Sequence, residues 1–266
     1  MEKIFDSVRA LDKRAEEVFN LKNGVLMEHA ARGMTERIGS LFPSPLVQIV
    51  CGSGDNGGDG FALARMLAGF CNVLVVSVKE PKSPLCKLQR ERLELLGIPV
   101  TAELQEHCDV LVDAVFGTGI RGSLDNEMCA VIDRMNAVQG YKIACDIPSG
   151  LNEFGIPSPV AFRADETCTM GVLKTALYAD AAKDYTGDIH VLNLGLPRHC
   201  YEGETDTFLL SAADMKLPHR AVQNTHKMSY GHGLFFCGEK TGACMLAASA
   251  ALHFGIGLVT VFGAPV

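Results

Sequence analysis

The sequence contains no block of lysine or arginine residues. Its 266 residues include 24 Lys and Arg against 31 Asp and Glu, so the formal net charge is −7. Nucleic acids and anionic membrane surfaces bind clustered positive charge, and the sequence therefore excludes them as favoured partners. A small anionic ligand remains compatible with this composition, because backbone N–H groups bind phosphate without net positive charge on the protein.

The ten cysteines form no C-x-x-C pair, and we expect no signal segment before them. The opening residues, "MEKIFDSVRALDKRAEEVF", are charged and helix-like from the start. The cysteines are spread singly along the chain, and several lie inside apolar runs. This pattern predicts reduced, mostly buried thiols in a cytoplasmic protein and argues against a structural zinc site.

One stretch could be mistaken for a membrane span, because "ACMLAASAALHFGIGLVTVFGAPV" at 243–266 has no Asp, Glu, Lys or Arg. It contains His253, Gly255 and Gly257, and then the β-rich "LVTVF". We interpret it as a helix of small residues, a glycine stop and a buried strand rather than a membrane span.

Short apolar runs alternate with helical patterns along most of the chain. The apolar runs lie at 46–51, 73–78, 110–116 and 142–147, with another inside 187–197. The helical patterns lie at 61–67, 85–96 and 127–138, after two N-terminal helices at about 8–19 and from Leu26 to Ile38. Strands that are apolar throughout are typical of a parallel sheet covered on both faces. The sequence therefore predicts an α/β fold with a mostly parallel sheet.

The composition changes after Pro197. A polar, turn-rich segment follows, and then "GHGLFFCGEKTGACMLAASAALHFGIGLVTVFG" predicts a strand, a helix and a strand. A unit of about sixty residues rarely buries a core of its own. We expect it to pack on the first domain or to be a fragment of a longer domain.

Three of the predicted strands end in polar, glycine-containing turns. These turns are "CGSGDNGGDG" after the first strand, "VDAVFGTGIRGS" at 112–123 and "CDIPSGLN" at 145–152. Ligands of open parallel sheets bind outside the carboxyl ends of the strands, so three such turns favour one shared site. The alternative is that these Asp and Asn residues only cap helices and form turns.

The first turn also matches G-x-G-x-x-G at Gly52, Gly54 and Gly57, and Glu80 follows the next strand. Such a match is typical of dinucleotide-binding enzymes, although on its own it is a weak signal. Asp55 and Asp59 in the same turn would repel a pyrophosphate group, which argues against an ordinary dinucleotide fingerprint.

The three motifs "GSGDNGGDG", "DAVFGTGIRG" and "DIPSGLN", in this order and spacing, closely resemble the NAD(P)H-hydrate epimerases, the YjeF N-terminal domain family. The opening segments "RALDKRA" and "GVLMEHAARG" are similar to the first helices of that family. The resemblance covers residues 1–205 and implies an epimerase domain with a Rossmann-like three-layer α/β/α sandwich. It also implies a nicotinamide nucleotide repair enzyme that epimerises the R and S forms of hydrated NADH and NADPH with a bound potassium ion.

The resemblance assigns roles to individual residues. It implies potassium ligands at Asn56, Asp113 and Ser149. It implies substrate contacts from two loops and one strand end: Asp55, Asn56, Gly57, Gly58, Asp59, Gly117, Thr118, Gly119, Ile120, Arg121, Gly122, Ser123 and Asp146. Oxygen donors suit a hard cation, and the cation would offset the carboxylate charge that repels phosphate.

The implied substrate carries a hydroxyl group on the ring carbon beside the ring nitrogen. Protonation of that hydroxyl expels water and leaves an iminium cation, and water returning to the other face inverts the carbon. One carboxyl group that acts first as an acid and then as a base can perform both steps, and Asp146 is the predicted catalytic residue. Lys174 either contacts the substrate or faces solvent. His29 stands where the family more often has Asn, which leaves the contact at that position open.

Residues 206–266 resemble the start of the ribokinase-like dehydratase domain that often follows the epimerase. The nucleotide-binding and catalytic motifs of that domain are absent from these residues, so we expect no dehydratase (lyase) activity from this chain. A multifunctional version that continues past residue 266 would also dehydrate the S epimer. His226, Lys227 and His232 are weak candidates for that activity.

Two other functions remain open at this point. The chain could be an NAD(P)-dependent oxidoreductase that uses the glycine fingerprint, or a non-catalytic dinucleotide-binding or interaction module. The expected partner is a small-molecule substrate in the cytoplasm. The sequence leaves open the preference between NADH and NADPH hydrates and whether the protein forms a homo-oligomer.

Overall fold

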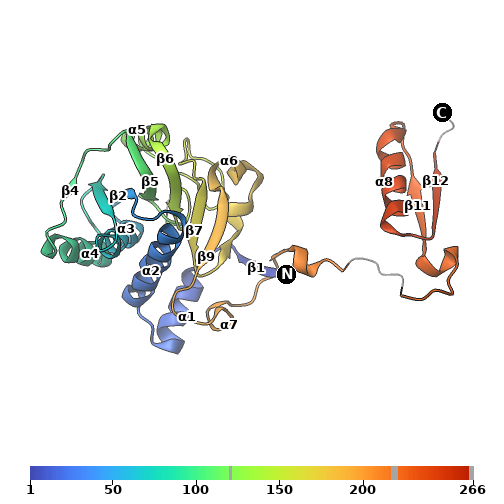
Figure 1. Ribbon diagram of the computed structural model, residues 1–266, viewed down its shortest axis with the longest axis horizontal. Coiled ribbons are helices and arrows are strands. Elements are labelled where there is room, and N and C mark those ends of the chain that lie inside the picture. The colour runs from blue at the N-terminus through green and yellow to red at the C-terminus, as the bar shows by residue number, and fades with distance from the viewer. Residues whose placement is uncertain (120–121, 217–220, 264–266) are drawn as a thin grey trace. The chain divides into compact units, whose positions relative to one another are not determined.

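The computed structural model describes residues 1–119, 122–216 and 221–263, and the chain divides into two compact units (Figure 1). The larger unit is Glu2–Leu209, and the smaller one is Leu210–Val266 together with Met1. The three turns singled out in the sequence all belong to the larger unit.

The larger unit contains a seven-stranded sheet in the order β4-β3-β2-β5-β6-β7-β9, and every neighbouring pair is parallel. Its strands are β2 (Leu46–Cys51), β3 (Asn72–Ser77), β4 (Val100–Thr101), β5 (His107–Ala114), β6 (Gln139–Cys145), β7 (Glu166–Met170) and β9 (Asp188–Leu192). The chain runs outward from β2 to β4 and then returns to β5 on the other side of β2. The strand order therefore reverses between β2 and β5.

Helices cover both faces of this sheet (Figure 1). Helices α2 (Asn23–Leu41), α3 (Asp55–Leu67) and α4 (Pro84–Leu95) share one apolar cluster with Ile49 of β2. Helix α5 (Asn126–Ala137) shares a second cluster with Val50, the next residue of the same strand. Successive strand residues face opposite sides of the sheet, and both sides are covered by helices. Ile49 and Val50 are therefore both apolar. The predicted α/β fold with a covered parallel sheet is confirmed.

A small three-stranded sheet lies beside the N-terminal helix α1 (Arg9–Phe19) and was not anticipated from the sequence. It has the order β10-β1-β8, from β10 (Phe208–Leu209), β1 (Glu2–Phe5) and β8 (Leu173–Lys174). The remaining short elements of this unit are η1 (Thr175–Tyr178), η2 (Asp180–Ala182), α6 (Lys183–Thr186) and α7 (Arg198–Tyr201). A third apolar cluster joins Leu11 of α1 to Tyr201 of α7, so the two ends of the unit pack together.

Helix α3 begins at Asp55, six residues before the predicted start, because its glycines allow close contact with the sheet. A Cβ atom on Gly57 would lie 2.0 Å from the carbonyl oxygen of Gly52, and one on Gly52 would lie 2.0 Å from that of Val115. One on Gly60 would lie 2.7 Å from Ala114 Cβ. The glycines thus bring the first turn of α3 directly against the ends of β2 and β5.

The smaller unit contains η3 (Ala212–Asp214), η4 (Lys227–Tyr230), β11 (His232–Phe236), α8 (Thr241–Phe254) and β12 (Leu258–Phe262). Strands β11 and β12 pair in parallel. Phe236 and Leu246 remain 77% and 74% exposed, and Ala248 is the one buried apolar side chain in the described part of this unit. The predicted strand, helix and strand are present, but they enclose almost no core.

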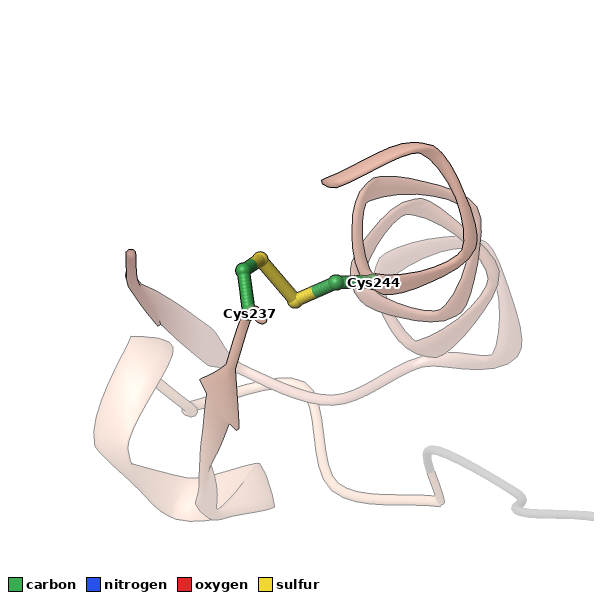
Figure 2. Close-up of a disulfide and its surroundings, with 2 residues drawn as sticks. All are labelled: Cys237 and Cys244. Carbon is green, nitrogen blue, oxygen red and sulfur yellow. A yellow bond between two sulfur atoms is a disulfide. The ribbon is translucent and has the colours of Figure 1, made fainter. Parts of the chain in front are cut away.

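Cys237 and Cys244 form a disulfide in the smaller unit, so the prediction that all cysteines are reduced is wrong for this pair (Figure 2). The two cysteines lie seven residues apart, at the end of β11 and in the first turn of α8. The turn between them brings their Cα atoms to 5.4 Å, a separation that a disulfide spans. The other eight cysteines are free, and Cys51, Cys86, Cys145 and Cys168 are buried.

The uncharged segment at 243–266 contains a helix and a strand, as predicted. Helix α8 ends at Phe254, Gly255 adopts a left-handed conformation with φ of 114°, and β12 follows. None of the helices in the described residues is long and apolar enough to span a membrane.

We predict that Gly57→Ala destabilises the protein and that Gly54→Ala, in the same turn, does not. The Gly57 methyl group would meet a backbone oxygen that cannot move aside, whereas a Cβ on Gly54 meets nothing within 4 Å. Overpacking of this kind costs about 1–3 kcal/mol. Urea unfolding of both variants measures the difference, and equal stabilities would show that the close contact is not required.

Candidate active site

A cavity of about 650 Å³ lies at the carboxyl ends of the central strands, where the strand order reverses. The segments that follow β2, β5 and β6 line it, together with residues of α1, α2 and α7. Open parallel sheets bind ligands at such a switch point, and the volume is in the usual range for small-molecule sites.

The structure brings most of the predicted substrate residues to this cavity. Those that line it are Asp55, Asn56, Asp59, Gly117, Thr118, Gly119, Ser123 and Asp146. Gly57 and Gly58 lie behind them and pack against Gly52 and Met27, and Gly122 is exposed outside the lining. Ile120 and Arg121 lie outside the described residues.

Asp146 occupies a constrained position just after β6. Its φ of 72° is left-handed, which few residues other than glycine, Asn and Asp tolerate. Its Oδ1 atom accepts hydrogen bonds from Lys174 Nζ at 2.6 Å and from the backbone N–H of Met170 at 3.1 Å. This carboxyl group is therefore oriented by two donors on β7 and β8.

Lys174 is 2% exposed, so the solvent-facing alternative is wrong. Besides Asp146, its ammonium group donates to Thr169 Oγ1 at 2.6 Å. Lys174 does not line the main cavity but a smaller one next to it, which Thr118 and Gly119 also line. Its ammonium group thus lies behind Asp146 and stabilises the negative charge of that side chain.

Asp113 and Ser149 form a buried pair with no exposed surface. Asp113 accepts hydrogen bonds from Ser149 Oγ at 2.6 Å, from Ser149 N at 2.7 Å and from Val115 N at 3.1 Å. Burial raises the pKa of Asp113 to about 6, although these hydrogen bonds oppose the rise. No cationic side chain in the described residues pairs with Asp113. The negative charge of its ionised form is therefore stabilised by these hydrogen bonds alone among the described residues.

Asn56 lies in the first turn of α3 and is 8% exposed. Its amide nitrogen is buried and has no hydrogen-bond partner in the described residues. A Cβ atom on Gly117 would lie 3.5 Å from Asn56 Oδ1 and 3.4 Å from Asp146 Oδ2. Glycine at position 117 therefore keeps space free between two polar side chains from different elements.

Two further carboxyl groups line the cavity and are in unusual surroundings. Burial, followed by the negative charges of Asp146 and Asp55, raises the pKa of Asp59 well above its usual value. Burial also raises the pKa of Asp12, which accepts a hydrogen bond from the hydroxyl group of Tyr201. Asp12 and Tyr201 were missed from the sequence, because neither lies at a predicted strand end.

Lys79 is another lining residue that the sequence did not indicate. It follows β3 and pairs with Asp125, the N-cap of α5, at 3.3 Å. Glu80, the acidic residue of the dinucleotide fingerprint, does not line the cavity, and its side chain is 89% exposed. His29 contacts Gly195 and lines a separate cavity, so its departure from the family pattern leaves the main cavity unchanged.

Known proteins resemble this chain in sequence. Residues 23–176 match the family described as YjeF-related protein N-terminus. The chain is 43% identical over 265 residues to the "Bifunctional NAD(P)H-hydrate repair enzyme" of Helicobacter pylori, which covers 97% of this chain and 56% of that protein. It is 33% identical over 202 residues to the "NAD(P)H-hydrate epimerase" of Rhodopirellula baltica. The aligned residues cover 71% of this chain and 82% of that protein.

The crystal structure of yeast ynu0 has a similar fold, with a TM-score of 0.64 at 20% sequence identity over 78% of this chain and 96% of that one. The chain spans about half the length of the bifunctional relatives it matches, 56% of the first and 51% of that from Archaeoglobus fulgidus. Asp12 and Tyr201 both lie outside the residues matched to the family.

We predict that Lys174→Met destabilises the protein strongly, because it leaves the Asp146 carboxylate buried without its cation. Breaking a buried ion pair in this way costs about 3–5 kcal/mol. The double variant Lys174→Met with Asp146→Asn removes both charges and should lose less stability than Lys174→Met alone. Denaturant unfolding of the two single variants and the double variant tests this, and strictly additive losses would rule out a direct interaction.

Proposed function

Since the chain belongs to the YjeF-related protein N-terminus family, we propose that it interconverts the R and S forms of hydrated NADH and NADPH. The observation that carries this proposal is the cavity at the switch point. Asp55, Asn56, Asp59, residues 117–119 and Asp146 line it together. The relatives named as NAD(P)H-hydrate epimerase and repair enzyme supply the substrate class. Eight free cysteines are compatible with the reducing cytoplasm, which we include in the proposal.

The strand order suggests how a dinucleotide would lie in the cavity. Lys79 follows β3. On the far side of β2 and β5, Asp146 follows β6, Met170 ends β7 and Leu194 follows β9. The cavity therefore runs across the strand ends, with Lys79 and its partner Asp125 toward one end and Asp146 toward the other. We place the pyrophosphate near Lys79 and the N–H groups at the start of α3, and the hydrated ring near Asp146.

This placement suits the chemistry of the hydrated ring. Loss of the ring hydroxyl as water leaves an iminium cation, and the carboxylate of Asp146 would stabilise that positive charge. Water that attacks the opposite face must give up a proton as it bonds to carbon. Oδ2 of Asp146 lies toward Gly117 and is not one of the atoms held by Lys174 or Met170, so it is available to accept that proton.

The direct test is epimer interconversion of purified NAD(P)H hydrate by the 266-residue chain, measured above the spontaneous rate. Hydride transfer from NAD(P)H to a second substrate would support the oxidoreductase alternative instead. Tight dinucleotide binding without turnover would support the non-catalytic alternative.

We predict that Asp146→Asn lowers the epimerisation rate by about 10²–10⁴-fold, because an amide does not transfer protons at neutral pH. Asn also tolerates the left-handed backbone at this position, so the variant should fold. Binding of the hydrate, measured by calorimetry, should change much less than turnover. Near-normal turnover would assign proton transfer to another group.

We also propose that Asn56, Asp113 and Ser149 hold a potassium ion. The donor set consists of amide, carboxylate and hydroxyl oxygens, which suits a hard cation, and the described residues supply no counter-ion for buried Asp113. The ion would supply positive charge that offsets the carboxylates of the cavity where the anionic substrate enters. The three residues would hold it in place from α3, β5 and the turn after β6.

We predict that potassium chloride raises the melting temperature of the substrate-free chain more than choline chloride at equal ionic strength. An ion that binds only the folded state adds about 2.7 kcal/mol at roughly one hundred times its Kd. Asp113→Asn should abolish the difference between the two salts, whereas Asp133→Asn, an exposed change on α5, should preserve it. If the wild-type chain melts alike in both salts, the potassium site is disproved.

The smaller unit has a proposed role because the longer relatives are named as bifunctional enzymes. We propose that residues 206–266 are the start of a ribokinase-like dehydratase domain, as their sequence indicates, and that the second activity of such a protein would need the rest of that domain. The weak candidates His226, Lys227 and His232 belong to this unit and have no part in the proposed epimerisation.

A further inference from the structure

Asp59 lies in the second turn of α3, and the backbone on both sides of it packs closely against the protein interior. Its two neighbours are glycines that pack against the protein interior: a Cβ on Gly58 would lie 2.9 Å from Met27 Cε, and one on Gly60 would lie 2.7 Å from Ala114 Cβ. The backbone on both sides of Asp59 is therefore pressed inward, and its own side chain lines the cavity. The helix turn has little room to move this carboxyl group.

Asp59 on α3 and Asp146 after β6 lie near the ends of two neighbouring strands, β5 and β6. Gly60 contacts Ala114, the last residue of β5, and Asp113 of β5 pairs with Ala144 of β6, two residues before Asp146. Both carboxyl groups line the same cavity, so one ligand can contact both.

The two carboxyl groups have opposite surroundings. The Asp146 carboxyl group accepts hydrogen bonds from an ammonium group and a backbone N–H. The side chain of Asp59 has no hydrogen bond or ion pair in the described part of the chain. Among the described residues, the charged groups that face Asp59 are Asp146, Asp55 and Asp12, with Lys174 as the opposing cation. Burial and these three negative charges raise the pKa of Asp59 well above its usual value, and Lys174 only partly offsets them.

A pair of carboxyl groups in such different surroundings divides acid and base roles between them. We propose that Asp59 is the proton donor of this site and Asp146 the proton acceptor, an inference that rests on the proposed epimerisation. This assignment replaces the prediction that one residue, Asp146, performs both proton transfers.

The reaction then balances in two steps. The Asp59 carboxylic acid gives its proton to the ring hydroxyl, the C–O bond breaks with its electron pair on the departing water, and the ring nitrogen lone pair forms the C=N bond of the iminium cation. A second water molecule then bonds to the opposite face of that carbon, the C=N π pair returns to nitrogen, and Asp146 takes the released proton. Proton exchange through cavity water returns the pair to its starting state, and the reverse reaction uses the same groups in the opposite order.

The pH dependence of epimerisation tests the donor role. A donor must be protonated, so the wild-type rate above the spontaneous reaction should fall as the pH rises through the raised pKa of Asp59. Asp59→Asn should lower the rate by about 10²–10⁴-fold and remove this alkaline decline, because no titrating donor remains. Asp59→Glu should recover part of the rate and part of the alkaline decline. Asp146→Asn should lower the rate but keep the alkaline decline.

An infrared pH titration of the substrate-free chain gives a second readout that does not depend on turnover. At a pH well above the pKa of about 6 of Asp113, the C=O band of a protonated carboxylic acid should persist in the wild type and in Asp133→Asn, and Asp59→Asn should lower its intensity. A wild-type spectrum that Asp59→Asn leaves unchanged would overturn the inference.

The outcomes separate this inference from the proposed function. An active wild type whose rate and pH profile survive Asp59→Asn would overturn the donor role and leave epimerisation standing. A wild type without epimerase activity would overturn both, even if the infrared band of Asp59 were present.

Discussion

The contact between the first turn of α3 and the ends of β2 and β5 determines the geometry of the whole site. Gly52, Gly57 and Gly60 leave no space for a side chain there, so the helix backbone lies against the sheet. Asn56 and Asp59 are consequently brought to the ends of strands that begin elsewhere in the sequence. The glycines of this turn therefore allow the close packing, and that packing positions the polar residues of the turn.

The second constraint is the concentration of carboxyl groups in one cavity. Asp12, Asp55, Asp59 and Asp146 all line it, and Asp113 is buried beside it. Hydrogen bonds reduce the cost of that charge for three of them: Asp146 accepts from Lys174, Asp113 from Ser149 and Val115, and Asp12 from Tyr201. Asp59 has no such partner among the described residues, which suits it to hold a proton. Negative charge also suits a reaction that passes through a cationic ring, because a carboxylate stabilises the intermediate more than the neutral substrate.

The small sheet and the pairing of α1 with α7 extend the site beyond the three loops. Tyr201 packs its ring against Gly171, the residue after Met170, whose N–H and carbonyl oxygen bond to Asp146 and Lys174. The two ends of the larger unit thus support the turn that orients Asp146. The smaller unit lacks such support within the described residues, since its apolar side chains remain largely exposed.

Most of the fold follows from the sequence, because an alternating series of apolar strands and helices has few stable arrangements. The strand at 46–51, the stripe of Leu26, Ala30, Met34 and Ile38, and the glycine turns at the strand ends could all be recognised locally. The identity of the residues in the turns could likewise be read, since each motif is contiguous. The sequence could not show the burial of Lys174, the Asp12–Tyr201 pair, the Cys237–Cys244 disulfide or the different surroundings of Asp59 and Asp146. These depend on which side chains from distant segments meet and how much water they exclude, and both are decided only when the chain has folded.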